Sequence, residues 1–292
     1  MVNRRSFGRL LSGGLLMLAC PARSASGERA LVDLAGRRVV VPRSVRRVAT
    51  VGAGPVLNGF VFAARRADAL VNGLPGFART PRWAYHMLFA PRLADMPIPQ
   101  AANGGPNLET LLALAPDVVL TSSAEVAESL QSSGLICLAM GLVTPEDVKA
   151  AARLVQDVFE EEDHGAVYAA YFDSIVAEAR EKLAHVTKEA RPRVLNAHFD
   201  ALTQLHKIGE WWIPMAGGVS VTDNGRAAQA HKFDIEAVLK WNPDRILVSS
   251  RSEKVAVAAD ARLVELNAVR NGEIHVVPCA STTGATTPSS GR

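Results

Sequence analysis

The sequence contains few aromatic residues, few cysteines and no long apolar run. Aromatic residues make up 5% of the 292 residues, and the chain has only three cysteines. No apolar run reaches the roughly 20 residues that a membrane span requires, so any membrane contact must come through an anchor or a partner. A chain of this length buries a large core without help from disulfides or metal ions, and it fits two lobes better than one.

A basic excess is also missing once the first 26 residues are set aside. The formal net charge is +3, but Arg4, Arg5, Arg9 and Arg23 stand in a segment without acidic residues. Subtracting these 4 charges from +3 leaves −1 for the rest of the chain. Binding of nucleic acid requires a clustered basic face, so a nucleic-acid partner is not expected.

Residues 1–26 have the charged, apolar and small-residue regions of an export signal. The pair Arg4 and Arg5 resembles the start of a twin-arginine signal. Cleavage near Ser24 or Ser26 would release a soluble periplasmic protein. The residues before Cys20 form a poor lipobox, which leaves a lipid anchor on Cys20 as the alternative.

Short strand-like runs alternate with helical runs along the rest of the chain, as in parallel sheets covered by helices. A hairpin is expected over 30–42. The longest helical stretch begins at Thr144, and an apolar stripe at helical spacing continues it over 164–185. We therefore predict an α/β fold of two similar lobes, each a parallel sheet flanked by helices, joined by a long interlobe helix. The expected strands are 47–51, 69–72, 117–121, 135–140, 193–198, 245–249 and 274–277.

One segment of the sequence occurs twice. Residues 107–123 and 234–250 both place an Asn or Asp helix cap before an apolar residue and a glutamate. Both then run for about two helical turns, stop at Pro-Asp and enter a strand. A repeat at this distance predicts two lobes of like topology rather than a solenoid. In open α/β sheets the ligand lies beyond the carboxyl ends of the strands, so two facing sheets would form a cleft.

These features together resemble the class III, or cluster A-II, periplasmic solute-binding proteins of ABC importers for iron-siderophore, haem or cobalamin. The resemblance also rests on residues 32–37, 39–42 and 216–218. It implies a monomer that captures a metal chelate between its lobes, has no cofactor and is not an enzyme. The implied organisation is an export signal at 1–26, an N-terminal lobe at 27–143, an interlobe helical segment at 144–190 and a C-terminal lobe at 191–278. Residues 279–292 depart from the family, and their composition predicts a disordered or truncated tail.

The resemblance further implies that one glutamate on each lobe docks to the ABC transporter permease. The matching residues are Glu109 and Glu236, one in each copy of the duplicated segment. Exposed carboxylates on matching lobes would give a charge-complementary contact that fixes orientation. The alternative is that each glutamate only stabilises the first turn of its helix.

The scarcity of aromatic residues makes two aromatic groups in loop-like stretches informative. Flat aromatic rings on the two sides of a cleft suit a bulky chelate, and an arginine can neutralise an anionic group of the ligand. If the adjacent tryptophans form a strand, they point to opposite faces and at most one lines the site. The alternative is that some of these residues belong to the core. The candidate ligand-binding residues are Arg82, Trp83, Tyr85 and His86 from one lobe and His206, Trp211 and Trp212 from the other.

Other functions remain open at this point. Seven histidines are present but no HxH, HExxH or CxxC spacing occurs, so no metal-ligand set is predicted and a bare-cation receptor is the weaker alternative. An oxyanion such as molybdate is a second alternative. An exported enzyme is a third, although the Gly-x-Ser-x-Gly and P-loop patterns are missing. Cys137 stands in an apolar run and is expected to be a buried core thiol.

Overall fold

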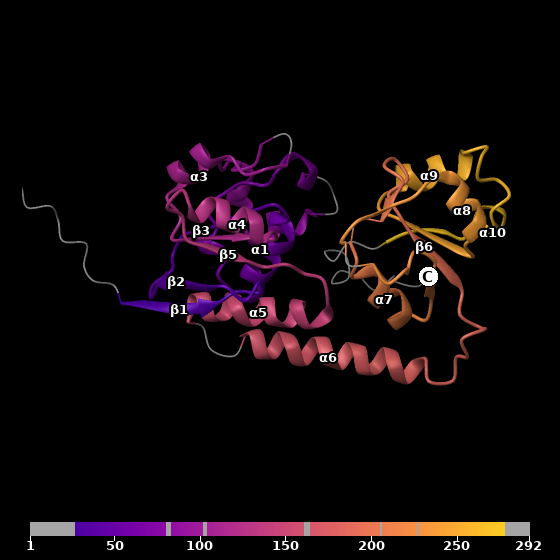
Figure 1. The fold of residues 1–292 in the computed structure, drawn as a ribbon, viewed down its shortest axis with the longest axis horizontal. Coiled ribbons are helices and arrows are strands. Elements are labelled where there is room, and N and C mark those ends of the chain that lie inside the picture. The colour runs from indigo at the N-terminus through magenta and orange to yellow at the C-terminus, as the bar shows by residue number, and fades with distance from the viewer. Residues whose placement is uncertain are drawn as a thin grey trace, which may run out of the picture.

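The computed structural model describes residues 27–79, 83–101, 104–160, 164–204, 206–226 and 228–277. Two α/β lobes stand side by side and helix α6 runs beneath both (Figure 1). This arrangement confirms the predicted fold class. The predicted export signal and the predicted tail lie outside the described residues.

The N-terminal lobe is built on a parallel sheet in the order β3-β4-β5, with bounds Val48–Val51, Val118–Thr121 and Cys137–Ala139. Every residue of these strands is buried, because helices cover both faces of the sheet. Side chains such as Val48 and Leu120 pack with α1 (Gly54–Ala63) and α5 (Pro145–Phe159). The alternating side chains, such as Ala49 and Val119, pack with α3 (Leu108–Leu114) and α4 (Ala124–Gln131) on the other face.

The C-terminal lobe repeats this topology in a parallel sheet of order β11-β10-β6-β8. In both lobes the first strand lies beside the strand that belongs to the duplicated segment: β3 lies beside β4, and β6 lies beside β10. The edge position next to β3 is filled by Leu70, which forms a parallel bridge with Val48. The strands are β6 (Arg193–Asn196), β8 (Val219–Ser220), β10 (Arg245–Val248) and β11 (Ile274–Val276), and the core helices are α8 (Ile235–Trp241), α9 (Arg251–Ala259) and α10 (Asn267–Arg270).

The duplicated segment folds in the same way in both lobes. Asn107 accepts a hydrogen bond from the backbone of Thr110 at the start of α3, and Asp234 accepts one from Ala237 at the start of α8. Both helices end in a left-handed residue, Ala115 in α3 and Asn242 in α8. The following aspartates, 117 and 244, each accept backbone N–H bonds from the segment that precedes the neighbouring strand. The predicted internal repeat is confirmed.

A buried carboxylate connects the predicted hairpin to the first sheet. Strands β1 (Glu28–Val32) and β2 (Arg38–Pro42) pair antiparallel, as predicted. Asp33, in the turn, is 4% exposed and forms an ion pair with Arg37 at 2.6 Å. Its side chain also accepts the backbone N–H of Ala139 in β5, at 2.9 Å. The turn is therefore fixed to the edge of the sheet.

The interlobe segment consists of two helices rather than one continuous stretch. Helix α5 begins with a capping box at Thr144 and ends at Glu160 in the left-handed conformation. Helix α6 (His164–Lys182) then packs on α5 so closely at Gly165 that an added Cβ would lie 2.8 Å from Arg153 Cα. The predicted apolar stripe is only partly buried, and Tyr171 remains 65% exposed, because α6 spans the two lobes instead of lying in a core.

Three further observations complete the comparison with the sequence. Residues 69–72 form a single bridge instead of the predicted strand. Cys137 is fully buried, as predicted, and burial raises the pKa of its thiol to about 12, against the opposing effect of Arg37. Among the described residues, no helix combines the length and apolar character needed to cross a membrane.

The short elements are α2 (Tyr85–Phe89), β7 (Thr203–Gln204), α7 (Gly209–Met215) and β9 (His231–Lys232).

Candidate functional site

The N-terminal lobe holds an aromatic group at the carboxyl edge of its sheet. Tyr85, in α2, donates a hydrogen bond from Oη to the carbonyl of Pro55 at 3.1 Å. Pro55 belongs to the first turn of α1, which begins directly after β3. Trp83 lies next to Tyr85, with ring centroids 6.1 Å apart. The predicted residues Trp83 and Tyr85 therefore stand where open α/β sheets bind their ligands.

His86 is the buried member of this group. Its side chain is 0% exposed, and its ring centroid lies 4.3 Å from that of Tyr85 and 5.2 Å from that of Phe62. Burial lowers the pKa of His86, and the carbonyls of Trp83 and Pro55 act in the opposite direction. Nδ1 lies 3.0 Å from the Trp83 carbonyl oxygen, whereas Nε2 makes no hydrogen bond of good geometry with a described residue. His86 thus lies in the interior, where its ring packs against those of Tyr85 and Phe62.

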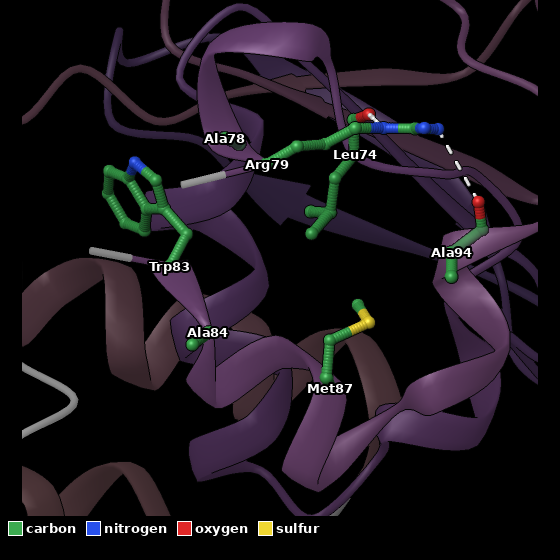
Figure 2. A pocket seen from close by; sticks show the side chains of 7 residues that line it. All are labelled: Leu74, Ala78, Arg79, Trp83, Ala84, Met87 and Ala94. Carbon is green, nitrogen blue, oxygen red and sulfur yellow. Dashed lines mark hydrogen bonds between the residues drawn. The ribbon is translucent and has the colours of Figure 1, made fainter. Parts of the chain in front are cut away.

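A cavity of about 330 Å³ opens beside the aromatic group. Figure 2 shows Trp83 on the left of the cavity, the Arg79 side chain along the top and Met87 at the bottom. The Arg79 guanidinium donates to the carbonyls of Leu74 and Ala94, each at 3.4 Å. The cavity walls are thus largely apolar, with one cation at the side. Arg82, the cation predicted for this lobe, lies outside the described residues, and Arg79 was not predicted. The residues that line the cavity are Leu74, Ala78, Arg79, Trp83, Ala84, Met87 and Ala94.

The two adjacent tryptophans of the C-terminal lobe lie in helix α7, so the strand considered for them is wrong. Trp211 stacks on Phe172 of α6, with ring centroids 5.8 Å apart and planes at 19°. It lines a second cavity, of about 250 Å³, between α5, α6 and α7. Trp212 turns its indole nitrogen toward Gly209, and His206 is exposed on the preceding segment.

A buried ion pair anchors α7, and no pattern in the sequence predicts it. Arg226 and Glu210 lie 2.7 Å apart, with side chains 8% and 10% exposed. Arg226 also donates to Gln204 at 2.8 Å, and Thr222 donates to the same amide oxygen at 2.6 Å. Three buried atoms of this cluster have no hydrogen-bond partner among the described residues: Gln204 Nε2, Glu210 Oε2 and Arg226 Nε. Because the charges of Arg226 and Glu210 cancel, the ion pair carries no net charge.

Among the described residues, Trp83 and Trp211 line different cavities with no lining residue in common. The first group contacts the start of α1, which follows β3, through Tyr85. The second group lies in α7, which follows β6 and β7. Contact of these residues with a common ligand stays a prediction.

The glutamates predicted to dock are exposed on matching helices. Glu109 lies in the first turn of α3 and Glu236 in the first turn of α8. No hydrogen bond or ion pair connects either carboxylate to a described side chain. Among the described residues, no three His, Cys, Asp or Glu side chains come together in a way that could hold a metal ion.

Comparison with known proteins gives consistent matches. The family described as periplasmic binding protein matches residues 70–279. The molybdate-binding protein MolA of Haemophilus influenzae is 26% identical over 298 aligned residues, which cover 90% of this chain and 82% of MolA.

Solved structures extend the likeness of the fold. Helicobacter pylori CeuE with Ni(II) bound superposes with a TM-score of 0.73 at 16% identity, covering 86% of this chain and 82% of CeuE. The haem-binding protein HmuT superposes with a TM-score of 0.66 at 19% identity, covering 86% of this chain and 83% of HmuT.

Proposed function

The chain belongs to the periplasmic binding protein family, whose members act outside the cytoplasm with ABC transporters, and from this premise we propose that it captures a metal chelate between its lobes. The chelate would be of the iron-siderophore, haem or cobalamin type. The protein would then deliver it to the permease of an ABC importer.

The main support for a chelate as the ligand is the aromatic group at the carboxyl edge of the N-terminal sheet. Trp83 lines a largely apolar cavity of about 330 Å³, and the ring of Tyr85 lies next to Trp83. Ligand pockets of this kind typically measure about 300 to 1,000 Å³ and combine apolar walls with a few polar groups. Arg79 at the cavity wall supplies a cation for an anionic group of the ligand.

An oxyanion is the second candidate, because MolA is named as a molybdate-binding protein. The start of α7 adds a physical argument. Three side-chain nitrogens, Gln204 Nε2, Asn196 Nδ2 and Trp212 Nε1, lie within 3.7 Å of the position that a Cβ of Gly209 would occupy. Each can donate a hydrogen bond, and donors of this kind stabilise an oxyanion without a neutralising cation.

Isothermal titration with ferric siderophores, haem, cobalamin and molybdate distinguishes the two candidates. For a chelate, we expect Trp83→Ala to raise the Kd about tenfold, because a large ring contact is lost. Leu88→Ala is the control, since Leu88 lies in the helix α2 that follows Trp83 and is 81% exposed. For molybdate, the Kd should not change with Trp83→Ala. If none of these compounds binds, both candidates are wrong.

We also propose that Glu109 and Glu236 dock to the permease, one from each lobe. Their exposure on matching helices supports this assignment, as does the lack of a hydrogen-bond or ion-pair partner for either carboxylate among the described residues. Charge reversal at both positions should abolish uptake while the Kd of the ligand stays unchanged. Normal uptake by the double variant would contradict the assignment.

A further inference from the structure

The two copies of the duplicated segment carry the same residue at a few positions, and most of these have a local structural role. The serines at 123 and 250 cap the helices α4 and α9 through their side chains. The aspartates at 117 and 244 accept backbone N–H bonds. The prolines at 116 and 243 end the preceding helices. These identities therefore follow from the fold of each lobe.

Two identities make no such contact among the described residues. Glu109 and Glu236 lie exposed in the first turns of α3 and α8, where a negative charge is also favoured, and neither carboxylate has a hydrogen-bond or ion-pair partner among the described residues. Leu112 and Leu239 follow them three residues later and are 50% and 41% exposed. A leucine on a solvent-facing helix position adds nothing to a core, and a single case needs no explanation. The same exposed leucine at the same position of both lobes does need one.

The leucine and the glutamate of each copy lie on the same helix face. Residues three apart on a helix are neighbours at the surface, so Leu112 lies beside Glu109 and Leu239 beside Glu236. Helices α3 and α8 both lie in the half of their lobe away from α6 (Figure 1). Each lobe therefore presents one carboxylate next to one apolar side chain, on the side of the molecule opposite the interlobe helix.

We propose that Leu112 and Leu239 are docking residues for the permease, each entering an apolar socket beside the basic group that receives the neighbouring glutamate. This inference rests on the proposed function and adds an apolar contact to it. Two matched docking points fit a partner that presents two equivalent subunits. A charged contact orients the complex, and burial of the leucine slows its dissociation.

Association of the full-length protein with its ABC permease in nanodiscs tests the inference. The variants are Leu112→Gln, Leu239→Gln and the double variant, with Val167→Gln on α6 as the control because Val167 is 64% exposed. We expect each single leucine variant to raise the Kd about fivefold and the double variant roughly 25-fold. The control should leave the Kd unchanged, and thermal unfolding should be similar for all variants.

The outcomes separate the leucines from the glutamates. An unchanged Kd for both leucine variants, or an effect of only one of them, would overturn the leucine inference. If Glu109→Arg and Glu236→Arg weaken association in the same experiment, the proposed docking still stands. If neither the glutamate nor the leucine variants change the Kd, the docking assignment itself is wrong.

Discussion

The two lobes share one topology but differ in how far their sheets are covered. In the N-terminal lobe all residues of β3, β4 and β5 are buried, and separate apolar clusters fill the two faces. In the described part of the C-terminal lobe one cluster forms the core, and β10 alternates between buried and more exposed residues. A shared strand order therefore does not fix how much apolar area each lobe buries.

The largest expected difference between the lobes is in the free energy of unfolding that is lost when a buried ion pair is broken. Asp33 accepts backbone N–H bonds from Ala35, Arg37 and Ala139, so Asp33→Ala leaves buried amides unpaired. We expect a loss of about 3 to 5 kcal/mol in the free energy of unfolding, which Arg37→Ala in the same chain does not restore.

The ion pair of the C-terminal lobe should behave differently. Arg226→Met alone leaves Glu210 buried and unpaired and should cost about 3 kcal/mol, but adding Glu210→Leu should recover most of this loss, because the carboxylate bonds side chains only. Urea unfolding combined with hydrogen exchange of each lobe measures these changes. Recovery in both lobes, or in neither, would remove the contrast.

A matched pair of leucines tests the difference in burial directly. Leu120 in β4 and Leu247 in β10 occupy the same position of the duplicated segment, but Leu120 is fully buried and Leu247 only half-buried. Leu120→Ala should destabilise the protein by about 3 kcal/mol and Leu247→Ala by about 1 kcal/mol. Equal losses, measured by urea unfolding, would show that the two sheets are covered to the same extent.

The smallest expected effect is a pH dependence of the stability of the N-terminal lobe, which His86 would cause. Burial lowers the pKa of His86 from its ordinary value of 6.5, so the unfolded chain binds the proton more readily than the folded one. The contribution to stability is complete above pH 6.5 and is lost as the pH falls through the lowered pKa. Thermal unfolding at pH 7.5 and pH 5 should show a smaller loss for His86→Phe than for the wild type. An equal loss would exclude this contribution.

Most of the framework could be predicted from the sequence because it depends on local patterns. Buried parallel strands appear as continuous apolar runs, and the caps at Asn107, Thr144 and Asp234 mark the starts of their helices. Helix α7 could not be predicted, since glycine, proline and two tryptophans give it weak helix propensity and tertiary contacts with Phe172 fix it. The end of α5 could not be predicted either, because no glycine or proline marks it. Glu160 itself adopts the left-handed conformation there.

The candidate site could be predicted only in part. The aromatic residues stand out by type, but burial of His86 depends on Phe62, which is distant in sequence. The cluster of Glu210 and Arg226 comes from α7 and from the segment after β8, and no short motif connects them. Residue type thus predicts which side chains take part in a site, whereas their burial is decided by contacts between elements.

The close packing at Gly165 decides where the two lobes can move. Because backbone meets backbone there, α6 is held against α5, and we expect it to move together with the N-terminal lobe. Any change in the angle between the lobes must then be taken up by residues 183–192 and by sliding of Trp211 over Phe172. The pivot of the molecule therefore lies at the far end of the interlobe helix, next to the C-terminal lobe.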